Sequence, residues 1–86
     1  MNQFSSIDWQ KVEYPFEVFA HLTEEEFHEL RFTINKFDGE FSIEADIVFK
    51  ETRKIFKHLT VLYRSYGGME LLSDAYAEVI KMISKK

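Results

Sequence analysis

The chain contains no cysteine, one proline and three glycines among its 86 residues. The absence of cysteine excludes disulfides, thiolate zinc sites and cysteine nucleophiles. No apolar run approaches the roughly 20 residues of a membrane span, and the opening "MNQFSSIDWQ" lacks the basic-then-apolar pattern of a signal peptide. We therefore expect a cytoplasmic protein without membrane segments. This length allows one hydrophobic core, so residues 1–86 are expected to form a single domain.

Charged and aromatic residues are the prominent features of the composition. Residues 1–46 hold eleven acidic and three basic side chains, residues 47–86 hold eight basic and four acidic ones, and the net charge is −4. There are nine Phe, four Tyr and one Trp. A core of this size accommodates so many rings with difficulty, which indicates that some of them cover the surface of a partner.

The stretch "LTEEEF" carries start signals of a helix. Thr23 and Glu26 have the spacing of a capping box, and the three glutamates suit the positive end of a helix dipole. One face of such a helix would hold the apolar residues Phe27, Leu30, Ile34 and Phe37. We predict a helix from Glu24 to about Phe37.

The stretch "FTINKFDGEFSIEADI" offers an alternative, because it alternates around Asp-Gly, the strongest short signal for a β-hairpin. In such a hairpin, over residues 31–47, Phe32 faces Ala45 and Ile34 faces Ile43. The two interpretations disagree about Phe32, which the hairpin buries and the helix leaves outside its apolar face. We favour the helix because its cap, dipole and apolar face agree, whereas the hairpin depends on one turn.

Residues 42–66 are predicted to form one long helix that ends at Gly67, with apolar residues around half of its circumference. Its opposite face would carry a basic stripe that is a candidate phosphate-binding site, made of Lys50, Arg53, Lys54, Lys57 and Arg64. If residues 24–37 and 42–66 fold back on each other, the early glutamates also approach this stripe. That internal pairing favours an antiparallel helical hairpin over the alternatives.

A further helix is predicted over residues 69–84, and two short helical pieces are predicted before residue 20, interrupted at Pro15. The predicted fold is therefore all-α, a three- or four-helix bundle with an antiparallel helical hairpin at 38–41. The alternative is an α+β fold with the β-hairpin at 31–47.

The stretch "RKIFKH" places Arg53 and His58 with four residues between them. This spacing resembles the Arg-x4-His pair of the HEPN ribonucleases, an α-helical family in which such a pair from each subunit serves RNA cleavage. The resemblance covers these six residues and implies a helical nuclease. On a helix the two side chains lie about 140° apart, and we interpret them as a solvated pair rather than a catalytic one.

Other catalytic or metal-binding patterns are incomplete. Glu25 and His28 form a Glu-x-x-His sequence, which is half of a di-iron bundle motif, but the chain holds no second copy. No Gly-rich phosphate loop or Ser-His-Asp grouping is evident. We therefore predict no catalytic, cofactor or metal site, and no enzyme.

The predicted function is that of a small protein-interaction module that binds and modulates another protein, as inhibitors, immunity or antitoxin-like proteins and regulatory subunits do. The predicted partner site is an exposed Phe32 with Glu25, Glu29 and Lys36 around it, and the acidic residues favour a partner with a basic surface. A homodimer is a further arrangement left open. A nucleic-acid-binding regulator that uses the basic face of the 42–66 helix is the first alternative, disfavoured by the acidic net charge. A HEPN-like ribonuclease is the second.

Overall fold

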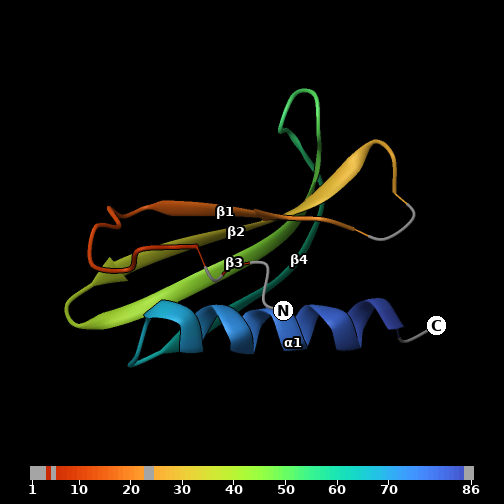
Figure 1. Cartoon of the computed structure of the whole chain (residues 1–86). Coiled ribbons are helices and arrows are strands. Elements are labelled where there is room, and N and C mark those ends of the chain that lie inside the picture. The colour runs from red at the N-terminus through yellow and green to blue at the C-terminus, as the bar shows by residue number, and fades with distance from the viewer. Residues whose placement is uncertain (1–3, 5, 23–24, 85–86) are drawn as a thin grey trace.

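The protein is an antiparallel β-sheet with one helix against it. The computed structural model describes residues 4, 6–22 and 25–84. Its elements, in chain order, are β1 (Phe16–Ala20), β2 (His28–Phe37), β3 (Glu40–Phe49), β4 (Ile55–Arg64) and α1 (Gly68–Ser84). The strands lie in the order β1-β2-β3-β4, and α1 runs along one face of the sheet (Figure 1).

The predicted all-α bundle is wrong, and the α+β alternative is closer to the structure. The residues expected to form helices over 24–37 and 42–66 form strands β2, β3 and β4 instead. Phe32 pairs with Ala45 and Ile34 with Ile43, which is the register of the alternative hairpin. The predicted capping residue Thr23 lies outside the described residues.

The connection between β2 and β3 explains why the hairpin forms. Asp38 has a φ of 50° and Gly39 a φ of 76°. Two consecutive positive φ angles are typical of the two-residue turn that matches the twist of paired strands, and Asp-Gly adopts them readily. The helical hairpin predicted at 38–41 is wrong because the segments on both sides of this turn are strands β2 and β3, not helices.

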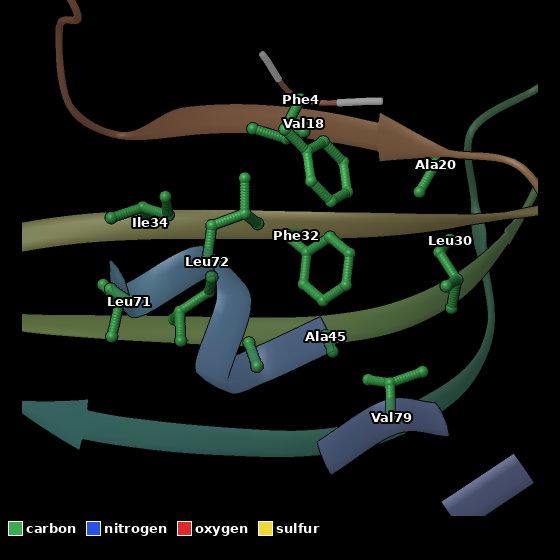
Figure 2. Packing of buried hydrophobic residues seen from close by; sticks show 12 residues of the cluster. Phe4, Val18, Ala20, Leu30, Phe32, Ile34, Ala45, Leu71, Leu72 and Val79 are labelled. Atoms are coloured by element: carbon green, nitrogen blue, oxygen red, sulfur yellow. The ribbon is translucent and has the colours of Figure 1, made fainter. Parts of the chain in front are cut away.

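Alternation along β2 places its apolar side chains on the face that α1 covers. Leu30, Phe32 and Ile34 are fully or almost fully buried, whereas Phe27 and Phe37, which the predicted helix would bury, are 67% and 50% exposed. Figure 2 shows Phe32 among side chains from β1, β3 and α1. The period of burial is therefore two residues, as in a strand, and not the 3.6 of a helix.

The N-terminal segment closes the core beside α1. The Phe4 ring packs edge-on against Phe32, with ring centroids 6.3 Å apart, and against Tyr76 of α1 at 5.7 Å. Trp9 packs against Phe16 in the same way at 5.7 Å. The short helical pieces predicted for this segment are replaced by turns and by strand β1.

The helix predicted over residues 69–84 is confirmed as α1. Leu72, Ala75 and Val79 of this helix are buried, while Ile80 and Ile83 are partly exposed. The Tyr66 hydroxyl donates a hydrogen bond to Asp74, which ties the end of β4 to the first turns of α1. Within the described ranges, no helix is both long and apolar enough to span a membrane.

We expect Phe32→Ala to lower the free energy of unfolding by about 3–5 kcal/mol, because it removes a fully buried ring from the centre of the core. Chemical denaturation followed by circular dichroism measures the change. Phe37→Ala is the matched control, since this half-exposed ring should contribute within about 0.5–1 kcal/mol. Equal destabilisation by both variants would contradict the described core.

Candidate functional site

The face of the sheet opposite α1, called the open face below, carries a row of side chains across all four strands. Phe19 pairs with Arg31, Arg31 with Asp46, and Asp46 with His58. Cross-strand partners share a face, and their neighbours Phe32 and Ala45 point into the core, so this row points away from it.

An irregularity in β4 puts His58 in this row. Ala45 pairs with Thr60, but the next residue, Asp46, pairs with His58, so Leu59 is an extra residue in β4. A regular strand would place Leu59 opposite Asp46 and turn His58 toward the core. The bulge therefore places the imidazole of His58 on the open face, while Leu59 packs against the hydrophobic core.

Asp46 is completely buried, yet both of its carboxylate oxygens have cationic or polar partners. The Arg31 guanidinium approaches Oδ2 at 3.5 Å, and His58 Nδ1 donates to Oδ1 at 2.9 Å. Arg31 also lies 3.8 Å from Glu17 and donates to the carbonyl oxygen of Arg53 at 3.4 Å. A buried carboxylate is tolerated only with such partners, so these contacts fix the geometry around Asp46.

Glu44 joins Asp46 and His58 to form a carboxylate–histidine cluster. Its Oε2 lies 3.3 Å from His58 Nδ1, and one ligand atom from each of the three residues lies within 4.8 Å of the others. Partial burial, together with the neighbouring Asp46, raises the pKa of Glu44. The hydrogen bond to Asp46 raises the pKa of His58 above its ordinary value of 6.5, and the charges of both acids add to this effect.

The Arg53–His58 pair is not on a helix, so the α-helical context of the HEPN ribonucleases is absent here. Arg53 lies in the turn before β4. Its guanidinium lies 3.7 Å from the centre of the Phe19 ring and 3.6 Å from the Glu29 carboxylate. The solvated helix pair that we predicted is therefore also wrong, because His58 is bonded to Asp46. The charged side chains of these networks on the open face include four acids (Glu17, Glu29, Glu44 and Asp46) and two arginines (Arg31 and Arg53). An RNA phosphate would meet this acidic surplus.

A second feature, the aromatic end, lies where β2 begins and the β3–β4 turn approaches it. His28, Phe49 and Phe56 form a ring cluster with centroids 4.4–5.4 Å apart. Phe27 and Phe49 line an adjoining pocket of about 380 Å³, and the remaining lining residues are Glu26, Lys50, Glu51, Thr52 and Lys54. The pocket thus combines an apolar wall with a charged rim.

Hydrogen bonds hold the two walls of this pocket together. The Lys50 amide donates to the Phe27 carbonyl at 2.8 Å, and the Lys50 ammonium donates to the Glu25 carbonyl at 3.4 Å. The Glu25 carboxylate lies 2.6 Å from His28 Nδ1. Glu25 and His28, which form the Glu-x-x-His sequence, therefore stabilise the chain beside the pocket.

The predicted partner site is not assembled as expected. Phe32 is fully buried and cannot act as an exposed anchor. Glu29 is paired with Arg53 on the open face, and Lys36 lies over the Phe41 ring at 5.5 Å. A partner with a basic surface was expected at an exposed Phe32, and the burial of this ring removes the reason for that expectation.

The predicted basic stripe is also divided. Lys50 and Lys54 line the pocket, and Arg53 faces Glu29. Lys57 lies on β4, and Arg64 lies 3.6 Å from Asp74 of α1. A strand and a turn distribute these five side chains in different directions, so they do not form the face of a helix.

The carboxylate–histidine cluster is not among the sites predicted from the sequence. Glu44 and Asp46 alternate with apolar residues in "SIEADI", which is the pattern of a strand with two acids on one face. That signal was available in the hairpin interpretation. His58 carried no comparable signal, because only the bulge at Leu59 turns it toward the acids.

Comparisons of the chain with protein-family models, with curated proteins and with solved structures found no match. A functional proposal therefore rests on the geometry of the chain's own residues.

We expect the pKa of His58 in the folded protein to lie above 6.5, measured by an NMR titration of its imidazole. Because the folded-state pKa is raised, the protonated ring stabilises the fold fully below the unfolded pKa near 6.5. This contribution is lost as the pH rises through the folded pKa. In His58→Gln, the corresponding decline in the free energy of unfolding should be absent. A midpoint at or below 6.5 would contradict the hydrogen bond to Asp46.

Proposed function

We propose that this chain is a small interaction protein that binds an extended acidic segment of another protein. The segment pairs with the outer edge of β4, and one of its apolar side chains enters the pocket at the aromatic end. A cytoplasmic location belongs to the same proposal. Binding inhibits or otherwise modulates the partner, and which of these effects occurs depends on the partner's own activity.

Exposed aromatic side chains at one end of the sheet carry the proposal. Phe27 is 67% exposed, Phe56 54% and Phe49 37%, and Ile55 beside them is 51% exposed. Apolar surface gathered around a pocket with a charged rim is typical of a protein-binding site, whereas scattered exposed apolar residues are not. These rings are the part of the phenylalanine-rich composition that we propose to contact the partner.

The outer edge of β4 offers backbone hydrogen-bonding groups beside these rings. β4 has ten residues and, within the part of the chain that the structure describes, pairs with β3 alone, so its other side is a free edge (Figure 1). The opposite edge strand, β1, has only five residues. A long free edge is a template for an added strand, which supplies affinity through main-chain hydrogen bonds and specificity through side-chain pockets.

The charges along β4 indicate the chemistry of the segment. Lys57, His58 and Arg64 lie in this strand, Lys54 precedes it, and no acidic residue lies between Lys54 and Arg64. Although His58 faces Glu44 and Asp46 and Arg64 lies near Asp74, this strand carries basic and no acidic side chains in a chain with a net charge of −4. An added strand with acidic side chains complements it.

Single-stranded nucleic acid is the second candidate ligand. Exposed Phe27 and Lys54 line the same pocket, a combination that suits base stacking and phosphate contact. Glu26 and Glu51 also line this pocket and would face the phosphates of a nucleotide stacked there, whereas the proposed peptide places an apolar side chain at this position. The peptide segment is therefore the better fit, and an oligonucleotide serves as a comparison in the test.

Selection of peptides from a displayed random library on the purified chain tests the proposal. The selected peptides should be acidic, contain an apolar or aromatic residue, and perturb the backbone amide NMR signals of β4. Phe56→Ser and Phe27→Ser should each weaken peptide binding about 30-fold, which corresponds to roughly 2 kcal/mol for an interface anchor. Fluorescence anisotropy with a labelled peptide measures this loss.

Phe37→Ser is the matched control, because Phe37 is a half-exposed ring at the far end of the β2–β3 hairpin. It should leave peptide affinity unchanged. Selected peptides that bind both site variants as tightly as the wild type, or that perturb β1 instead of β4, would overturn the proposal. Tighter, salt-sensitive binding of a single-stranded oligonucleotide would favour the second candidate.

A further inference from the structure

The carboxylate–histidine cluster on the open face lies apart from the aromatic end, and the proposed peptide interaction does not use the carboxylates of Glu44 and Asp46. Two residues of β3, Glu44 and Asp46, point the same way because they are two positions apart in a strand. His58 reaches them from β4 through the bulge at Leu59. Sequence-distant groups are thus brought together by the sheet, with a nitrogen and two carboxylate oxygens facing one another.

The distances from His58 Nδ1 to the two carboxylates are those between ligands of a common metal ion. His58 Nδ1 lies 2.9 Å from Asp46 Oδ1 and 3.3 Å from Glu44 Oε2. Ligands held about 2.0–2.2 Å from one ion are separated by roughly 3.0–3.5 Å in tetrahedral or octahedral geometry. A metal ion can therefore bind between His58 Nδ1 and the two carboxylates, with only small adjustments of these side chains.

The electrostatics of the open face favour a cation at this position. Glu44 and Asp46 are adjacent carboxylates, and the imidazole of His58 lies against both of them. Arg31 contacts Asp46 through Oδ2, on the other oxygen from His58, so Oδ1 is the oxygen directed into the cluster. A carboxylate oriented by a second hydrogen-bonding group is the usual arrangement around a protein-bound metal.

We infer that Glu44, Asp46 and His58 bind a divalent transition-metal ion of the Zn²⁺ type. The imidazole nitrogen and one oxygen from each carboxylate are the protein ligands, and solvent completes the coordination on the exposed side. Imidazole together with carboxylates suits zinc, whereas magnesium and calcium prefer oxygen ligands alone. The bulge in β4 then orients the imidazole of His58 toward the ion, and the burial of Asp46 fixes the position of its carboxylate.

Isothermal titration calorimetry of the untagged, chelator-treated chain with zinc chloride in a non-coordinating buffer tests the inference. We expect one saturable site and much weaker binding of magnesium chloride. His58→Gln and Glu44→Gln should each weaken zinc binding at least tenfold, since loss of even an outer-sphere partner costs about 10–100-fold. Both side chains are about half exposed, at 52% and 41%, so these substitutions should preserve the fold.

His28→Gln is the matched control, because His28 also contacts a carboxylate, that of Glu25, but among residues 4, 6–22 and 25–84 it belongs to no group of three metal-ligand side chains. It should leave zinc affinity unchanged. In the wild-type protein, zinc should shift the NMR signals of Glu44, Asp46 and His58, which tests the site without any substitution. Absence of saturable binding, equal loss in His28→Gln, or shifts centred away from these three residues would overturn the inference.

Discussion

The two-residue turn at Asp38-Gly39 is the constraint on which the rest of the structure depends. It fixes the register of β2 against β3, and a slip of one residue would reverse the face of every side chain in one strand. In the observed register, Phe32 lies opposite Ala45 in the core and Arg31 opposite Asp46 on the open face. The core and the charged row are therefore two consequences of one pairing.

The open face and the aromatic end each depend further on one departure from regular strand geometry. Register shifts occur in the β3–β4 pairing between Ala45 and Asp46 and between Ile47 and Val48. The first brings His58 to the acids of β3, and the second coincides with the extra residue Phe56, part of the aromatic end. Bulges commonly re-aim side chains near functional sites, and here each one adjoins a different candidate surface.

The small size of the domain explains the aromatic surface. A sheet covered by one helix has room for Phe32 and Phe4 in its interior. The β3–β4 turn lies away from α1 (Figure 1), and Phe49 and Phe56 lie on the two strands beside this turn. Phe27, Phe49 and Phe56 are partly open to solvent, and Phe27 and Phe49 line the pocket between two connections of the sheet.

The sequence by itself determined the C-terminal helix, the turn at Asp38-Gly39 and, in the hairpin interpretation, the pairing of Phe32 with Ala45. It also indicated that some aromatic residues lie outside the core. Local signals could not choose between helix and strand for residues 24–37, because Leu30 and Ile34 suit the apolar face of either. Only the tertiary structure decided that choice, through burial of Phe32 against α1, and only the bulge at Leu59 brought His58 to Asp46. Both outcomes depend on contacts between distant segments, which no local pattern contains.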